Sequence, residues 1–246
     1  MTLSVEHLSG GYSNYTVLHD LNFSVQAGEI VGLIGLNGAG KSTTIKHILG
    51  LLKPSAGEIL VNGHSLAEDN QAYRQALSYI PEQPILYPEL TLREHIQLIA
   101  LAYHIDPDQA MANAEPLLER FRLTERLDWL PIHFSKGMKQ KVMIVCAMLV
   151  DTMLYIIDEP FVGLDPLGID DFTQLLLKKR QAGAAILMST HILSSAEHYC
   201  DRFIFLHEGQ IKAQGTLQEI RQHFNKADAS LDELYVDLVR GQSHDL

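Results

Sequence analysis

The stretch that decides the fold is Gly35-Leu36-Asn37-Gly38-Ala39-Gly40-Lys41-Ser42-Thr43. It fits the pattern G-x-x-x-x-G-K-[ST] of a phosphate-binding loop. The apolar run 30–34 before it is typical of a buried strand, and residues 44–49 after it continue as a helix. A glycine-rich turn between strand and helix points backbone N–H groups inward, and the helix adds the positive end of its dipole. The sequence therefore predicts a site for nucleotide phosphates.

The side chains of this loop have distinct expected roles. Lys41 can reach the terminal phosphates, and the Ser42 hydroxyl can bind Mg²⁺. A dinucleotide-binding turn does not fit, because Thr43 stands where G-x-G-x-x-G needs its third glycine. A glycine-rich turn with an ordinary surface lysine is the remaining alternative, and the flanking strand and helix argue against it. The other ATP-binding positions expected in the loop are Gly35, Asn37, Gly38, Ala39, Gly40 and Thr43.

Composition limits the possible functions. The 246 residues are 46% hydrophobic and 20% charged, which suits one large domain or two subdomains of a globular protein. A net charge of −11 argues against general nucleic-acid binding, which needs clustered Lys and Arg. The two cysteines, Cys146 and Cys200, give neither a disulfide framework nor a zinc pattern, so we expect a reducing cytosol. The 12 histidines show no zinc-binding spacing.

No segment of the sequence predicts insertion into a membrane. The first residues lack the basic and apolar blocks of a signal peptide. The longest apolar run, 142–150, is far shorter than a membrane span and is ended by Asp151. If this protein serves a membrane, another chain must cross it.

Apolar runs predict a mostly parallel core sheet and an antiparallel β subdomain. Residues 3–8 and 17–25 alternate like half-buried strands, and Asn62-Gly63 is a turn signal after the run 58–61. The continuous apolar run 152–157 is typical of strands in parallel sheets, and residues 77–81 and 184–188 predict two further strands. Residues 172–181 predict a helix, and residues 203–206 and 210–212 predict a closing hairpin. The expected fold class is α/β.

A helical segment interrupts this pattern between residues 84 and 150. Thr91 and Glu94 form a capping box, and Asp106-Pro107 starts a second helix, which Pro116 should kink or divide. Ser135 caps a third helix, apolar nearly all round and therefore buried. We expect an ATPase domain over residues 1–220, with a helical insertion at about 84–150. A helix beginning near Ser230 belongs to a C-terminal extension, 221–246.

Two carboxylates and a histidine stand at predicted strand ends. Asp158 and Glu159 follow the run 152–157, and His191 follows 184–188. In open parallel sheets, ligands bind beyond the carboxyl ends of the strands, where the phosphate loop also begins. Asp158 can hold Mg²⁺ directly or through water, and Glu159 can polarise a water for attack on the terminal phosphate. His191 can orient that water or bind the γ-phosphate. A solvated turn is the alternative for the acidic pair.

Together these residues resemble the nucleotide-binding subunit of ATP-binding-cassette (ABC) transporters, over nearly the whole chain. The signature, Phe-Ser-Lys-Gly-Met-Lys-Gln at 134–140, makes the resemblance specific, because many other phosphate-loop ATPases lack it. The other matching motifs are Walker A (35–43), Walker B (154–159), the D-loop (163–166) and the switch histidine, His191.

The resemblance implies further site residues. Tyr12 matches the aromatic residue that stacks on adenine. From its position alone, stacking on a purine ring and packing against its own hairpin were equally favoured. Ser135, Gly137, Gln140 and Asp165 match residues that complete the ATP site from the signature and the D-loop. The fold implied is a P-loop NTPase of ABC type.

The sequence also departs from the family pattern. Lys136 replaces the first glycine of the signature, and Leu8-Ser9-Gly10-Gly11 imitates the signature but lies before Walker A. Glu82 stands where the Q-loop glutamine is expected, and Gln83 comes next, so either residue is a candidate Mg²⁺ ligand. The signature variant, the Pro-Glu-x-Pro loop at 81–84 and the short tail most resemble ATPase subunits of Ecs-type exporters of Gram-positive bacteria.

The resemblance implies an ATPase that uses ATP and Mg²⁺ and pairs head-to-tail with a second copy as a homodimer. It would power an exporter through an integral membrane permease, at the cytoplasmic face of the cell membrane, without nucleic acid. The alternative is a soluble ABC-type ATPase of cluster assembly or another non-transport role. Translation factors of this type usually have two cassettes, whereas this chain has one. Repair ATPases usually have long coiled-coil insertions, and residues 84–150 leave no room for one. A module that binds ATP without turnover would lack Glu159 or His191, and both are present.

Overall fold

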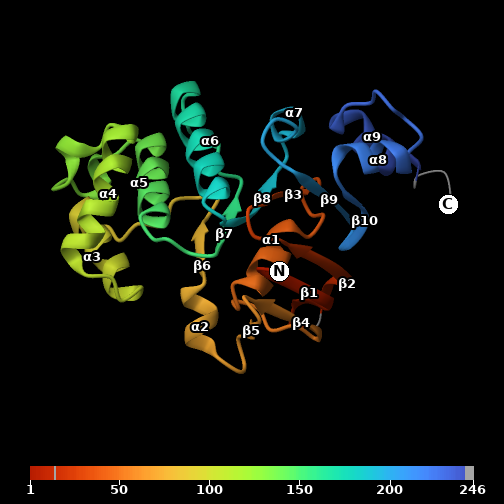
Figure 1. The fold of residues 1–246 in the computed structure, drawn as a ribbon, viewed down its shortest axis with the longest axis horizontal. Helices are drawn as coiled ribbons and strands as arrows, with labels where there is room; N and C mark the ends of the chain where they lie inside the picture. The colour runs from red at the N-terminus through yellow and green to blue at the C-terminus, as the bar shows by residue number, and fades with distance from the viewer. Residues whose placement is uncertain (14, 242–246) are drawn as a thin grey trace.

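A computed structural model describes residues 1–13 and 15–241 and is built around a six-stranded sheet (Figure 1). The strand order is β10-β9-β3-β8-β7-β6, and all neighbours are parallel except β9 and β10. The three central strands β3, β8 and β7 are buried at every position, which explains their continuous apolar sequences. The strands are β3 (Ile30–Ile34), β6 (Leu77–Ile80), β7 (Leu154–Asp158), β8 (Ala185–Thr190), β9 (Arg202–His207) and β10 (Gln210–Gly215).

A second, antiparallel sheet has the order β2-β1-β4-β5. Its strands are β1 (Leu3–Tyr12), β2 (Tyr15–Val25), β4 (Ala56–Val61) and β5 (His64–Ser65). Helix α1 (Lys41–Ile48) follows β3, and its Ile45 and Ile48 share a buried apolar cluster with Val5 of β1 and Leu33 of β3. Packing against both sheets fixes α1 and therefore the loop that precedes it. The imitation of the signature at 8–11 lies inside β1.

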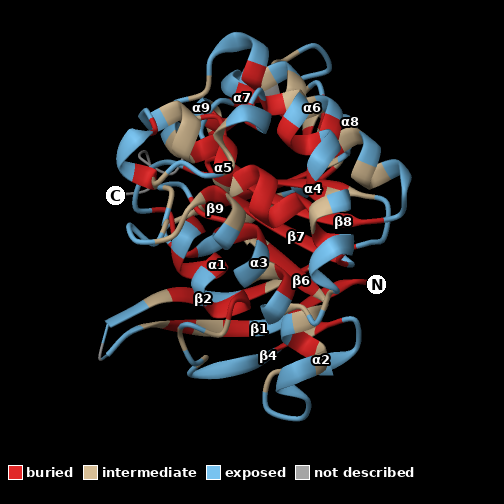
Figure 2. Ribbon diagram, turned by 90° about the vertical axis from the view of Figure 1, so that its left-hand side faces the viewer, coloured by how far each residue is buried: buried red, intermediate tan, exposed pale blue. Residues whose placement is uncertain are grey.

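The helical insertion is formed by α3 (Leu92–Ala102), α4 (Pro107–Phe121) and α5 (Lys136–Met148), which lie together at the left of Figure 1. The capping box of Thr91 and Glu94 and the cap at Asp106 are present as predicted. Helix α5 is buried along most of its length, as its apolar sequence predicts. Figure 2 shows that burial extends from the core sheet into the adjoining helices.

Of the two predicted effects of Pro116, division of the helix does not occur, because α4 runs unbroken from residue 107 to residue 121. Proline removes one backbone hydrogen bond within a helix, which frees the carbonyl four residues earlier. Pro116 and Ala112 both lie on the exposed face of α4, so water can satisfy that carbonyl. The buried face, which includes Leu118 and Phe121, continues past the proline and holds the helix together.

The structure adds three short α-helices and lengthens two others. Helices α2 (Asn70–Gln75), α7 (Leu193–Ala196) and α8 (Leu217–His223) were not predicted, and each is too short to show clear periodicity. Helix α6 (Pro166–Gln181) begins six residues before the predicted 172, and α1 begins at Lys41 instead of 44. The proposed domain limit at 220 falls within α8.

The C-terminal extension folds back onto the core sheet. Helix α9 (Leu231–Gly241) begins after the predicted capping box, in which Ser230 and Glu233 bond reciprocally. Residues 242–246 of the proposed extension lie outside the described residues. No helix within residues 1–13 and 15–241 is long and apolar enough to cross a membrane.

Candidate ATP-binding site

The phosphate loop lies between β3 and α1, as predicted. Gly38 and Gly40 have φ angles of 84° and 112°, a region that side chains with a Cβ rarely occupy. The ammonium of Lys41 is 7% exposed and turns back over the loop. It donates hydrogen bonds to the carbonyl oxygens of Gly35 at 2.7 Å and Leu36 at 3.5 Å. The loop therefore already holds a positive charge at its centre.

The carboxylate of Glu159 joins the phosphate loop to the switch histidine. Its Oε1 lies 3.8 Å from Lys41 Nζ, and its Oε2 lies 2.7 Å from His191 Nδ1. The backbone N–H of His191 also donates to Oε2 at 3.3 Å. The structure thus brings together the ends of three strands, β3, β7 and β8, as the sequence pattern predicts.

Glu159 has a φ of 46°, which is unusual for a residue with a side chain. Backbone strain of this kind costs about 1–3 kcal/mol and persists only where the surroundings enforce it. Here the enforcing bonds come from Ser189, whose carbonyl oxygen and Oγ both accept from the N–H of Glu159. The Ser189 hydroxyl donates to Asp158 Oδ1.

Sequence reasoning did not assign Ser189 a role, although it stands two residues before His191 at the end of the same strand. Its hydroxyl fixes both members of the acidic pair. Asp158 is 5% exposed, so the pair is a buried strand end and the solvated-turn alternative is excluded.

A cavity of about 880 Å³ opens beside the phosphate loop and contains Tyr12. Lys46 Nζ donates to the Tyr12 hydroxyl at 3.1 Å and lies 5.3 Å from the centre of its ring. Hydrogen bonds from Thr43 and Lys46 lower the pKa of Tyr12. Tyr12 ends β1 and remains 42% exposed, so an aromatic face is available at the cavity wall.

The cavity also has walls that the sequence pattern did not indicate. They come from β2 and from the turn between β9 and β10, where the Gly209 N–H donates to Ala39 O at 2.9 Å. A hairpin turn carries no motif that would place it against the phosphate loop. The lining residues are Tyr12, Tyr15, Thr16, Val17, His19, Leu36, Asn37, Gly38, Gly40, Lys41, Ser42, Thr43, Glu208, Gly209 and Gln210.

The signature residues lie away from this cavity. Ser135 is exposed and caps α5, where its Oγ accepts from the Met138 N–H at 3.3 Å. A Cβ on Gly137 would stand 2.5 Å from the carbonyl oxygen of Gly163 in the D-loop, so only glycine fits. The side chain of Lys136, at the altered signature position, lies against Gly163. The N-terminus of α5 and the D-loop therefore form one surface.

Gln140 and Asp165 join these two segments but differ in exposure. Gln140 is fully buried, and its amide donates to Pro160 O at 3.3 Å, so this chain does not present it for ligand contact. Asp165 is exposed, caps α6 and pairs with Lys141 at 2.9 Å. Hydrogen bonds from Lys141 and from the Gly168 N–H lower the pKa of Asp165.

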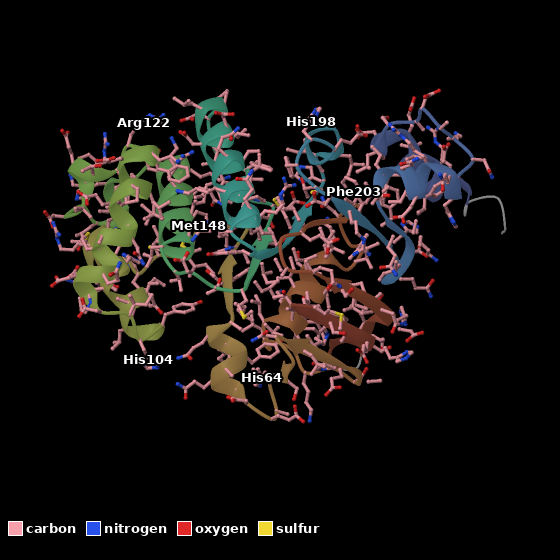
Figure 3. All side chains as sticks on the ribbon, in the orientation of Figure 1. His64, His104, Arg122, Met148, His198 and Phe203 are labelled. Atoms are coloured by element: carbon pink, nitrogen blue, oxygen red, sulfur yellow. The ribbon has the colours of Figure 1, made fainter. Side chains whose placement is uncertain are left out.

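The two candidate Q-loop ligands, Glu82 and Gln83, are both exposed just after β6. Burial raises the pKa of Tyr79, and the nearby carboxylates of Asp158 and Glu82 raise it further. Both carboxylates therefore lie near the Tyr79 hydroxyl. No group of three or more His, Cys, Asp or Glu side chains suited to a metal occurs in the described residues. The labelled histidines in Figure 3, His64 in β5 and His104 and His198 in turns after α3 and α7, lie in separate parts of the fold.

Comparison with known proteins identifies close relatives of this chain. A family profile described as "ABC transporter" matches residues 18–162. The chain is 54% identical to the ABC-type transporter ATP-binding protein EcsA of Bacillus subtilis (strain 168), over 97% of this chain and 96% of that protein. It is 39% identical to the SkfA peptide export ATP-binding protein SkfE of the same organism, over 85% of this chain and 87% of that protein.

A solved structure agrees with the fold. The chain is similar to the structure of an ATP-binding subunit of an ABC transporter, with 56% identity and a TM-score of 0.95. The match covers 97% of this chain and all of the other. The narrower resemblance to Ecs-type ATPases predicted from the signature is confirmed by these comparisons.

Proposed function

This chain belongs to the ABC transporter family as an ATP-binding subunit that hydrolyses ATP, and we propose from this premise that it drives export through a separate membrane permease. The observation that carries the ATP hydrolysis behind this proposal is the contact of Glu159 with both Lys41 and His191 at the phosphate loop. This arrangement places the ammonium of Lys41, which can bind phosphate, beside the carboxylate of Glu159, which can act as a base.

Each site residue has a separate role in ATP binding and hydrolysis. The N–H groups of residues 38–43 and the Lys41 ammonium bind the phosphates and stabilise the charge that develops on them. Glu159 accepts a proton from the attacking water, and His191 holds the carboxylate in place. The ring of Tyr12 stacks on the adenine.

The residues present also suit Mg²⁺, which prefers one or two carboxylates together with phosphate oxygens and water. The Ser42 hydroxyl and the Asp158 carboxylate would hold it, with Glu82 or Gln83 as a further ligand. Asp158 is buried and already fixed by Ser189, so its carboxylate is pre-oriented. When bound, the ion neutralises phosphate charge.

One chain does not contain the whole site. Ser135, Gly137 and Asp165 lie on a surface apart from the phosphate cavity, whose lining includes none of them. The exposed N-terminus of α5 can bind an anion through its N–H groups and dipole. Two copies arranged head-to-tail would place the signature of each against the ATP of the other, in a homodimer.

The permease would contact the helical insertion at the cytoplasmic face of the membrane. Large apolar side chains are exposed there: Ile85 and Tyr87 follow the Q-loop, and Leu101 lies on α3. We infer that these exposed apolar side chains belong to the contact surface for the permease. Export is supported by the similarity to the peptide export ATP-binding protein.

A pull-down from detergent-solubilised membranes tests the proposal. Tagged Glu159→Gln, with and without Mg-ATP, should recover a polytopic membrane protein. The Ile85→Ser and Leu101→Ser double variant of the same protein should lose that partner while it still binds ATP. Recovery of soluble proteins alone would contradict the transport role and favour a soluble ABC-type ATPase.

A further inference from the structure

The C-terminal helix α9 contacts the phosphate loop through the hydroxyl of Tyr235. The backbone N–H of Leu36 donates to the Tyr235 hydroxyl oxygen at 2.8 Å, although 199 residues separate the two in sequence. The Tyr235 hydroxyl in turn donates to the carbonyl oxygen of Leu206 in β9 at 3.4 Å. Tyr235 is 4% exposed, so water does not compete for these bonds.

The hydroxyl acts on the same peptide group that holds Lys41. The amide between Gly35 and Leu36 offers its carbonyl oxygen to Lys41 Nζ at 2.7 Å and its N–H to Tyr235 at 2.8 Å. Hydrogen bonds at both ends of one peptide group strengthen each other and fix the plane of the amide. Tyr235 therefore constrains where the Lys41 ammonium can sit.

The ring of Tyr235 is itself firmly placed. Its centre lies 5.5 Å from that of Phe205, in an edge-to-face arrangement of 79°. Leu231, Leu234 and Leu238 of the same helix are buried in the cluster that includes Phe203 of β9, labelled in Figure 3. The hydroxyl is thus held by a packed helix.

The other end of α9 contacts the segment that follows the switch histidine. The backbone N–H of Leu231 donates to the Glu197 carboxylate, just beyond α7 (Leu193–Ala196). Leu193 of α7 and Leu234 of α9 share one buried cluster. Helix α9 therefore contacts both the phosphate loop and the segment that follows His191.

We propose that Tyr235 is a positioning residue of the ATPase site. Its hydroxyl orients the amide between Gly35 and Leu36 and, through it, Lys41, and α9 ties this amide to the segment after His191. The proposal rests on the assignment of ATP to the phosphate loop. It makes the C-terminal helix part of the nucleotide site.

The test compares Tyr235→Phe with Tyr103→Phe. The Tyr103 hydroxyl also donates to a backbone carbonyl, Leu77 O at 2.8 Å, but lies at α3 and outside the ATP cavity. Loss of one hydrogen bond should weaken binding of a non-hydrolysable Mg-ATP analogue, and raise KM for ATP, by about three- to tenfold in Tyr235→Phe. In that variant kcat should change less than about twofold, and Tyr103→Phe should match the wild type in KM.

Hydrogen–deuterium exchange supplies a readout that a general loss of stability would not give. In Tyr235→Phe, exchange should quicken in the peptide that contains Leu36 and remain unchanged in the helical insertion. A uniform increase along the chain, or wild-type analogue affinity in this variant, would overturn the proposal. Failure of the wild-type protein to bind the analogue would instead overturn the ATP-site assignment itself.

Discussion

At the scale of single residues, Glu159 concentrates the chemistry of the site. It is buried, it adopts a strained backbone angle, and its two carboxylate oxygens face Lys41 and His191. Strain that is maintained by surrounding bonds is a feature of functional sites. We therefore assign the reaction's base to Glu159.

Glu159→Gln should bind ATP as the wild type does and lose about 10²- to 10⁴-fold in kcat, because the amide cannot accept a proton from water. The ATP-bound dimer should also persist longer, since hydrolysis no longer separates it. Steady-state hydrolysis and size-exclusion chromatography with ATP measure the two effects. Turnover at the wild-type rate would remove Glu159 as the base.

Lys41→Ala should weaken ATP binding by about ten- to a hundredfold, because a hydrogen-bonded charge on the phosphates is lost. The control is Lys53→Ala, which removes the same charge from an exposed position outside the ATP cavity. Calorimetric titration with a Mg-ATP analogue measures both variants. Equal affinities for the analogue would contradict the phosphate-loop assignment.

At the scale of elements, we propose that the N-terminus of α5 is an anion-binding surface that one chain offers to another. Ser135 is exposed and accepts a hydrogen bond from the Met138 N–H, which places it at the first turn of the helix. The adjacent D-loop packs against Gly137 without room for a side chain. We expect this surface to approach a phosphate that the other chain binds.

Ser135→Asp should keep α5 capped, because aspartate is as good a cap as serine, but should repel the γ-phosphate of the opposing site. We expect ATP hydrolysis to fall at least about tenfold, with little change in melting temperature. The neutral cap Ser135→Asn is the matched control and should retain more activity. Equal activities of Asp and Asn variants would argue that no phosphate approaches this helix.

Prediction of elements from the sequence succeeded where burial imposes a pattern. The central strands are continuous apolar runs because helices and the second sheet cover them, and parallel order then brings Asp158, Glu159 and His191 to one edge. Helices α2 and α8 are too short for the helical periodicity of apolar residues to be recognised in the sequence. The contact of Tyr235 with the phosphate loop could not be predicted, because no local sequence pattern pairs residue 235 with residue 36.

At the scale of the whole molecule, the phosphate loop and the signature, which we propose to be two halves of one ATP site, lie on separate surfaces of one chain. The phosphate cavity contains Lys41, and Ser135 belongs to the helical insertion. A closed head-to-tail pair would unite them twice, with each chain giving one phosphate loop and one signature. The central claim is therefore that hydrolysis occurs between two copies.

The most direct test is to mix Lys41→Ala with Ser135→Asp and measure ATP hydrolysis. In a mixed dimer, the intact phosphate loop of one chain meets the intact signature of the other. Each variant alone should be nearly inactive, and an equal mixture should recover about a quarter of wild-type activity if chains pair at random and sites work independently. If the mixture is no more active than the two variants measured separately, the claim that two chains together form each ATP site is contradicted.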